Sequence, residues 1–393
     1  RLTEVAVAVV AGALANKPLN GGEAWVRLSW LLGLRRLGYD GHLVERLPGS
    51  ACVDRAGAQA TFDDSLNRVH FDRVVDDFGL AGRATLLDEK GVTMRGLAID
   101  QVRELVAEAE VVFNLSGHLP PDLLPAGRGT RVYVDLDPGF TQVWHADPRL
   151  GFRLAGHDRH VTVGLNLANG RAALPPTRIE WVPTLPPVLL DEWPAQPLPT
   201  TRPFRFTTVA GWRSPYGPLR LGGRTLRLKH HEFRRAAGLP PRVAEASFEL
   251  ALDIHDDDAG DRAELERHGW SIVDPHGAGG DPAAYREYLR GSGAEFSVAN
   301  GVYVATRCGW FSDRTAAYLA TGRPALVQDT GIADLPLGEG LITFSNLRQA
   351  ADGARRIVRD PEREGRAARA LAEERLNSDL VLARLLAAIG VGG

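Results

Sequence analysis

The sequence is poor in cysteine and methionine, with two cysteines and one methionine in 393 residues. Cys52 and Cys308 are too few for a disulfide framework, so we expect a reduced, cytoplasmic setting. The formal net charge of −3 excludes a strong overall field that would attract nucleic acid or an anionic membrane. No apolar run reaches the length of a membrane span. We therefore expect no nucleic-acid partner and no membrane span.

Several motifs are also missing. We find no GxGxxG or GxxxxGK[ST] run, which disfavours a dehydrogenase and a P-loop ATPase. The His, Cys and acidic residues show no metal-ligand spacing, so we predict no metal site. Val5–Ala15 is apolar and ends like a signal-peptidase site, but only Arg1 precedes it as a basic residue, and we interpret it as a first strand. The abundance of Ala, Arg, Gly and Pro is typical of GC-rich, actinobacterial coding sequences.

Strand and helix patterns alternate along the chain, which predicts an α/β fold with two doubly wound sheets. Residues 50 to 110 look largely irregular apart from a helix over Ile99–Ala109. A proline-rich stretch before residue 203 cannot hold a central helix and predicts a linker. The expected division is a first Rossmann-like domain, a linker, a second Rossmann-like domain and a final helix, at residues 1–185, 186–203, 204–373 and 374–393.

The most informative stretch is Arg307–Gly331, which is interpreted as a loop, a helix, a short buried strand and a polar loop. Ser312 and Asp313 are good N-cap residues. The free N–H groups of a helix N-terminus favour a phosphate, and Arg314 and Thr315 add further donors. Ligands of open α/β sheets bind beyond the carboxyl ends of strands, where three polar residues follow the predicted strand: Gln328, Asp329 and Thr330.

This stretch resembles the donor-binding region of GT-B glycosyltransferases, which use nucleotide-diphospho-sugars. Arg307–Ser312, RCGWFS, is similar to the HCGWNS run of plant UDP-sugar-dependent transferases, although Arg307 and Phe311 depart from it. The resemblance implies that Ser312 binds the donor phosphate and that Gln328 and Asp329 bind sugar hydroxyls. We predict that the neighbouring residues also belong to the donor site: Asp313, Arg314, Thr315, Thr330 and Gly331. The usual helix Glu is missing, so the resemblance assigns no ribose ligand.

A strand–GG–helix unit near the start resembles the N-terminal unit of retaining family-4 GT-B enzymes. The resemblance implies that the backbone of Gly21 and Gly22 approaches the donor diphosphate, which a Cβ would prevent. A plain tight turn is the alternative. In the same family an Arg and a Lys after the first strand of the second domain clamp the diphosphate, which implies donor-binding roles for Arg213 and Lys229; a solvated basic surface is the alternative for Lys229. Trp212, in the same loop, is a further donor-site candidate.

Two further loops follow predicted strands of the first domain. His118 has an ordinary pKa near working pH and is a candidate for orienting reacting hydroxyls; a structural loop histidine is the alternative. Asp137 is the second catalytic candidate, with a turn residue as its alternative. Trp144 and His145 follow Asp137 closely in the sequence and are predicted to bind the acceptor, Trp144 by stacking on a sugar face. His276–Gly280 is interpreted either as a nucleobase platform or as a connector.

Together these features predict a GT-B fold and transfer of a sugar to a small-molecule acceptor, in bacterial natural-product or antibiotic biosynthesis. The nucleotide-diphospho-sugar is a co-substrate, and we expect no other cofactor. Transfer is expected to be metal-independent because Asp256–Asp258 falls in a surface turn. Inverting and retaining outcomes stay open, as does a monomer or homodimer. The alternatives are a GT-B-type UDP-sugar 2-epimerase and a catalytically inactive nucleotide-sugar or partner-binding protein.

Overall fold

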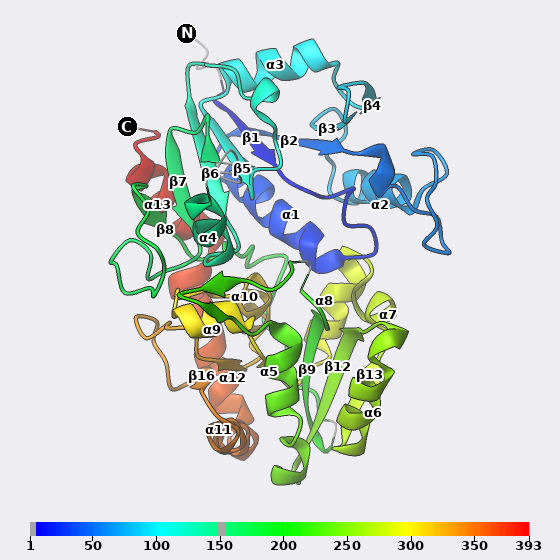
Figure 1. Cartoon of the computed structure of the whole chain (residues 1–393), viewed down its shortest axis with the longest axis vertical. Coiled ribbons are helices and arrows are strands. Elements are labelled where there is room, and N and C mark those ends of the chain that lie inside the picture. Colours follow the sequence, from blue (N-terminus) through cyan, green and yellow to red (C-terminus); the bar gives the residue numbers. More distant parts are fainter. Residues whose placement is uncertain (1–4, 148–153, 201, 215, 393) are drawn as a thin grey trace.

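The computed structural model describes residues 5–147, 154–200, 202–214 and 216–392. These residues form two α/β domains, one above the other along the long axis of the molecule (Figure 1). Each domain holds one mainly parallel sheet, as the alternation of strands and helices predicted.

The first sheet has eight strands in the order β4-β3-β2-β1-β5-β6-β7-β8. All neighbours pair in parallel except β3 and β4, which are antiparallel. The order reverses between β1 and β5, so the loops after these two strands flank a crevice at the sheet's carboxyl edge. The strands are β1 (Val7–Ala11), β2 (Asp40–Leu47), β3 (Ala84–Asp88), β4 (Thr93–Arg95), β5 (Val111–Leu115), β6 (Thr130–Asp135), β7 (Arg159–Thr162) and β8 (Trp181–Pro183).

The helices of this half are α1 (Gly21–Arg36), α2 (Leu66–Asp77), α3 (Ile99–Glu108) and α4 (Phe140–Ala146). The expectation of irregular structure over residues 50 to 110 is wrong, because α2, β3 and β4 lie there. Ser65 caps α2 by accepting a hydrogen bond from the Arg68 N–H. The buried face of α2 includes the polar residues Asn67 and His70, which weakens the apolar helical period.

The second sheet is fully parallel, in the order β13-β12-β9-β14-β15-β16, and its order reverses between β9 and β14. A short antiparallel ladder joins β10 and β11. The strands are β9 (Phe204–Gly211), β10 (Arg220–Leu221), β11 (Arg224–Thr225), β12 (Ala246–Asp253), β13 (Trp270–Val273), β14 (Ala294–Ser297), β15 (Ala325–Gln328) and β16 (Leu341–Phe344).

The helices of the second half were partly expected. The stretch from His276, interpreted as a platform or connector, belongs to a helix, and a further helix separates β14 from the Arg307 loop. The helices are α5 (Lys229–Ala236), α6 (Ala259–Arg267), α7 (Pro275–Gly279), α8 (Pro282–Arg290), α9 (Gly301–Thr306), α10 (Asp313–Ala320), α11 (Leu347–Arg359), α12 (Pro361–Leu371) and α13 (Ser378–Ile389).

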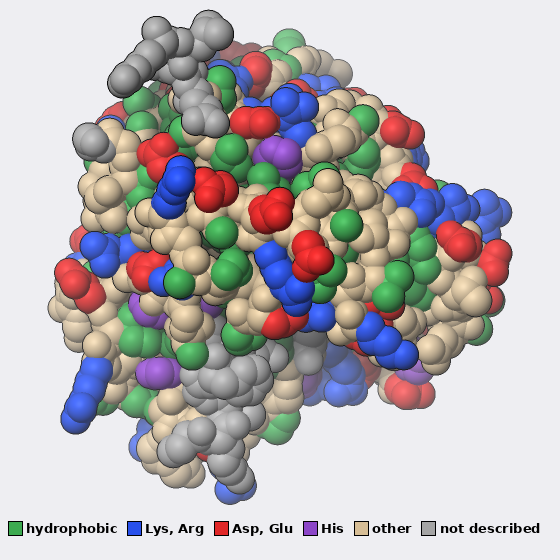
Figure 2. Space-filling model, turned by 90° about the horizontal axis from the view of Figure 1, so that it is seen from above, with side chains coloured by type: hydrophobic (Ala, Val, Ile, Leu, Met, Phe, Trp, Pro, Cys, Tyr) green, Lys and Arg blue, Asp and Glu red, His purple; other side chains and the backbone are tan. Residues whose placement is uncertain are grey.

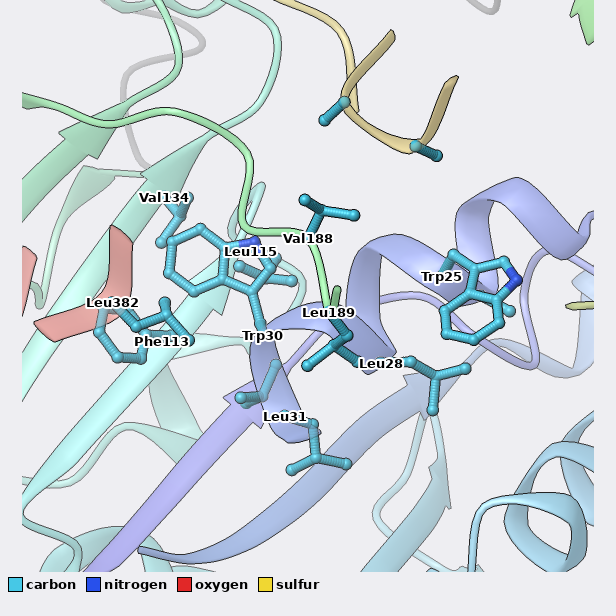
Figure 3. Packing of buried hydrophobic residues seen from close by; sticks show 14 of the residues in the cluster. Trp25, Leu28, Trp30, Leu31, Phe113, Leu115, Val134, Val188, Leu189 and Leu382 are labelled. Carbon is cyan, nitrogen blue, oxygen red and sulfur yellow. The ribbon is translucent and has the colours of Figure 1, made fainter. Parts of the chain in front are cut away.

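The chain returns to the first domain through α13, which packs against α1. Leu382 of α13 lies beside Trp30 and Phe113 in the core of the first domain (Figure 3). An exposed ion pair between Arg36 and Asp379, with a Nε–Oδ1 distance of 2.9 Å, joins the same two helices. The expected final helix that crosses back is therefore confirmed.

No helix among the described residues is long and apolar enough to cross a bilayer. On the face of the first domain seen from above, Lys and Arg side chains alternate with Asp and Glu (Figure 2).

Candidate functional site

A cleft of about 1180 Å³ lies between the two domains. Its first wall is formed by the loop after β1, the start of α1 and the turns after β5 and β6. Its second wall comes from the loops after β9 and β14 and from the starts of α5, α7 and α10. Both walls thus lie at the carboxyl ends of parallel strands, where α/β sheets bind ligands.

Lys229, the first residue of α5, lines the second wall and is half-buried. Among the described residues, its ammonium group has no hydrogen-bond or ion-pair partner. Burial, helped by the nearby Arg314 guanidinium, lowers the pKa of Lys229 to about 8. Lys229 is therefore protonated at neutral pH and presents an unneutralised cation to the cleft.

Arg314 lies in the first turn of α10 and is held rigidly. Its Nε donates to Glu295 over 2.8 Å, and its other nitrogens donate to the Val209 carbonyl and the Ser297 hydroxyl. Glu295 is fully buried, so its carboxylate fixes the guanidinium from behind. Ser312 caps the same helix by accepting from the Arg314 N–H over 3.2 Å. Because Glu295 neutralises the Arg314 guanidinium, Lys229 and the N-terminus of α10 are the groups of this wall that are open to an anion.

Asp137 faces these groups from the first domain. Its two carboxylate oxygens accept hydrogen bonds from Tyr303 and Tyr216, over 2.8 and 3.0 Å. Burial raises the pKa of Asp137 despite these two bonds, and the charge of Glu23 adds to the rise. Because both tyrosines belong to the second domain, Asp137 also ties the two domains together across the cleft.

His118 occupies a sharp turn after β5, where Ser116 and Gly117 have φ values of 53° and 69°. Asn114 is fully buried and fixes this turn, because its amide both donates to and accepts from the backbone of Leu119, over 2.9 and 2.8 Å. The turn therefore presents His118 to the cleft in a defined position.

Glu23 and Arg27 of α1 also line the cleft, and sequence analysis did not select them. Their side chains form an ion pair, with Arg27 almost fully buried. Burial opposes ionisation of Glu23, but the charges of Arg27, Lys17 and His118 outweigh it and lower its pKa. The signal available in the sequence was the acid directly after the paired glycines.

The cleft brings together only part of the predicted site. Eight of the predicted residues line it: Gly22, His118, Asp137, Arg213, Lys229, Ser312, Asp313 and Arg314. The other predicted residues are described by the structure but lie outside its lining: Gly21, Trp144, His145, Trp212, Thr315, Gln328, Asp329, Thr330 and Gly331.

The polar residues at the end of β15 and directly after it bond to neighbouring segments of the second domain and do not line the cleft. The Gln328 side chain donates to Glu232 and accepts from the Ala299 N–H. Asp329 pairs with Arg307 and accepts from the Gly331 N–H, and the Thr330 hydroxyl donates to the Trp310 carbonyl in the loop before α10. Each of these side chains is thus bonded within the second domain and lies outside the cleft lining, and their sugar-binding role stays a prediction.

The Arg307–Gly309 part of the HCGWNS-like run joins the domains. Asn166 of the first domain donates to the carbonyls of Arg307 and Gly331, and its N–H donates to the Cys308 carbonyl. A Cβ on Gly309, which has a φ of 79°, would lie 2.9 Å from the Asn166 nitrogen. Glycine is required there by this contact.

Gly21 is likewise explained by a contact between domains. A Cβ at Gly21 would lie 2.1 Å from the Asp281 carbonyl oxygen of the second domain. The indole of Trp25, one turn further along α1, donates to the Pro282 carbonyl over 2.9 Å. This contact accounts for the glycine at position 21, whose donor-binding role stays a prediction, whereas Gly22 lines the cleft.

Two other predicted ligands pack elsewhere, and one is already paired. Trp212 stacks on Phe233 in the core of the second domain. Trp144 packs edge-on against Tyr216, with ring centroids 4.8 Å apart, and so supports the wall from behind. Arg213 lines the cleft, but Asp258 holds its guanidinium through two bonds of 2.6 and 2.7 Å.

No cluster of three His, Cys, Asp or Glu side chains within the described ranges could hold a metal ion.

Comparisons with known proteins identify the fold of the chain. No protein-family model and no curated protein sequence matches the chain. An alpha-glucosyltransferase solved with UDP-glucose and DNA containing an abasic site is 10% identical, with a TM-score of 0.58 over 98% of this chain and 99% of that one. Anabaena HepE, solved with UDP and glucose, is 11% identical, with a TM-score of 0.58 over 98% and 100%. AviGT4, a glycosyltransferase involved in avilamycin A biosynthesis, is 14% identical, with a TM-score of 0.53 over 98% and 97%. These likenesses establish the GT-B fold.

Proposed function

We propose that this GT-B chain transfers a sugar from a nucleotide-diphospho-sugar to a small acceptor that has an apolar body. The observation that carries the proposal is the cleft-facing Lys229, which has no partner among the described residues and lies beside the N-terminus of α10, opposite Asp137 and His118. The structures that this chain resembles include glycosyltransferases solved with UDP or UDP-glucose, which agrees with a nucleotide-sugar donor.

In the proposed reaction the diphosphate lies against Lys229, the Ser312 hydroxyl and the start of α10. As the bond from the sugar to the diphosphate breaks, negative charge grows on the leaving phosphate. Fixed donors aimed at that charge stabilise the transition state more than the ground state. Asp313 lies at the same helix start, where an ionised carboxylate repels phosphate, so we assign it to the sugar hydroxyls.

On the opposite wall, Asp137 and His118 are the groups that orient and deprotonate the acceptor hydroxyl. The raised pKa of Asp137 makes its carboxylate a stronger base than an exposed aspartate. The two tyrosine hydroxyls fix its orientation. Whether the transfer inverts or retains configuration depends on which face of the sugar the acceptor meets, and the proposal covers both.

Beside His118 the cleft carries an apolar strip of Pro120 and Pro121, which is backed by the buried Leu119 and Leu124. The arginine next to it, Arg46, is bonded to both Asp122 oxygens over 3.0 and 3.1 Å. An apolar body gains free energy by covering this strip, whereas nucleic-acid phosphates need cations that are not already neutralised. This favours a hydroxylated apolar small molecule, as in natural-product assembly.

A second candidate is the 2-epimerase reaction, and one observation favours it. Acids and a histidine gather in the cleft, since Glu23, Asp137, Asp313 and His118 all line it. Such a cluster suits removal and return of a proton on the donor sugar. In deuterium oxide without acceptor, an epimerase incorporates deuterium at C2 of the donor sugar, and a transferase does not.

The test is release of nucleoside diphosphate from a panel of UDP-, dTDP-, GDP- and ADP-sugars, with and without hydroxylated apolar acceptors. The proposal predicts release from one donor, accelerated by an acceptor and reduced at least 100-fold in Asp137→Asn. A nucleotide that binds without any turnover indicates the inactive binding protein instead. Equal acceleration by duplex DNA would overturn the small-molecule acceptor.

A further inference from the structure

The cleft continues beyond Lys229 along the second domain, over the carboxyl ends of β9 and β12 to α7. Gly211, Asp253, His276 and Gly279 line this extension. Gly211 and Asp253 are the last residues of their strands and pair with each other in the parallel register. The extension therefore starts next to the proposed phosphate site and ends at a short helix.

Asp253 is an exposed carboxylate that the fold itself does not use. Among the described residues it has no hydrogen bond or ion pair through its side chain. Its backbone is fixed, because its carbonyl accepts from the Trp212 N–H over 2.8 Å. By contrast, the nearby Asp258 is fully engaged by Arg213. The backbone of Asp253 is therefore fixed on the cleft wall, and among the described residues its carboxylate oxygens are not already bonded.

On helix α10 the acid that lines the cleft is Asp313, in the first turn at the proposed phosphate site. Helix α10 presents Ala317 to the cleft, and its buried face consists of small and apolar residues with Thr315. The ribose of a nucleoside diphosphate lies between its diphosphate and its base. In Rossmann-type sheets, an acidic side chain at a strand end accepts hydrogen bonds from ribose hydroxyls. Asp253 is an acidic side chain at the end of a strand, and it lies between Lys229 at the proposed phosphate site and α7.

We infer that Asp253 binds the 2′- and 3′-hydroxyls of a ribonucleoside in the donor, with the base over Pro275 and His276 at the start of α7. The inference rests on the proposed function. It adds the sugar of the nucleotide as a recognised feature and makes the site selective for ribonucleotides over 2′-deoxyribonucleotides.

The test uses titration calorimetry on the full chain with UDP, GDP and ADP, their 2′-deoxy forms and inorganic pyrophosphate. The variants are Asp253→Ala and, as a matched control, Asp257→Asn, which changes an exposed neighbouring carboxylate outside the cleft lining. A hydrogen bond to a charged group contributes roughly ten- to 100-fold in affinity. We expect the wild type to bind one ribonucleotide roughly tenfold more tightly than its 2′-deoxy form.

In Asp253→Ala this preference should vanish while pyrophosphate affinity stays unchanged, and Asp257→Asn should behave like the wild type. An unchanged ribonucleotide preference in Asp253→Ala overturns the inference and leaves the proposed function standing. If the wild type binds pyrophosphate as tightly as every nucleotide, the inference is likewise overturned and the proposed function is left standing. If neither pyrophosphate nor any nucleotide binds the wild type, the proposed function fails, and the inference fails with it.

Discussion

Replacing Lys229 with methionine is expected to separate donor binding from stability. The ammonium is half-buried and has no partner among the described residues, so its charge is available to a bound diphosphate. Charge-assisted hydrogen bonds contribute about 1.5–3 kcal/mol, which corresponds to roughly ten- to 150-fold in Kd. Lys229→Met should weaken nucleoside diphosphate binding by that factor.

The same substitution should not destabilise the free protein. The lowered pKa of Lys229 reports that the fold disfavours its charge, so removing the charge while keeping an unbranched apolar chain should leave Tm unchanged or raise it. A variant that both binds weakly and unfolds early would indicate a structural lysine.

The pH dependence gives an independent check. With a pKa of about 8, Lys229 is mostly protonated at pH 7 and mostly neutral at pH 9. Nucleotide affinity of the wild type should therefore fall by about tenfold between these pH values, and this fall should be lost in Lys229→Met. Lys90→Met, which removes an exposed lysine outside the cleft lining, should keep the wild-type profile. Identical pH profiles in wild type and Lys229→Met would refute the reasoning.

Three further predictions follow from single contacts. Gly21→Ala places a Cβ 2.1 Å from the Asp281 carbonyl oxygen and should lower the unfolding free energy, measured in urea, by about 1–3 kcal/mol. Gly260→Ala is the control, because the space around Gly260 is open, and it should not lower the unfolding free energy. Equal effects of the two substitutions would contradict the contact. Asp137→Asn should reduce turnover at least 100-fold and leave nucleotide Kd within about threefold, and a large loss of binding would assign Asp137 to the donor site. Glu45 accepts three backbone N–H groups, and burial raises its pKa to about 7. The folded state therefore binds more protons than the unfolded state between pH 4.5 and 7, so unfolding free energy falls as the pH rises through this window, by at most about 3 kcal/mol. Glu45→Gln should remove that part of the fall, and an unchanged pH slope would contradict it.

Much of the fold could be predicted because local signals and tertiary structure agree. The helix expected over Ile99–Ala109 is present as α3, and the helix and short buried strand expected within Arg307–Gly331 are present as α10 and β15. Helix α2 was missed because Asn67, a polar residue, is fully buried by bonds to the backbone of Ala15 and Ala51. Those partners are distant in the sequence, so no local period shows them.

Residues that line the cleft could be predicted where their place after a strand, or at the start of a helix, brings them to the cleft. His118 and Asp137 follow strands of the first sheet, and Lys229 and Ser312 begin helices of the second domain; all four line the cleft. The direction of a side chain is set by partners elsewhere, as for Gln328, whose amide turns inward to Glu232.

The reason for glycine at position 21 also lies in a residue that is distant in the sequence. The need for glycine at Gly21 arises from Asp281, a residue of the other domain, and the sequence pattern alone suggested a diphosphate.

The most direct test of the central claim is product release from intact nucleotide-sugars by the wild type. One nucleotide-sugar should be turned over, with its nucleoside diphosphate released faster when a hydroxylated apolar acceptor is present. That activity should be lost in Asp137→Asn, and Lys229→Met should raise the KM for the donor. If no nucleotide-sugar is turned over and no nucleoside diphosphate binds the wild type, the cleft is not a donor site and the account is contradicted.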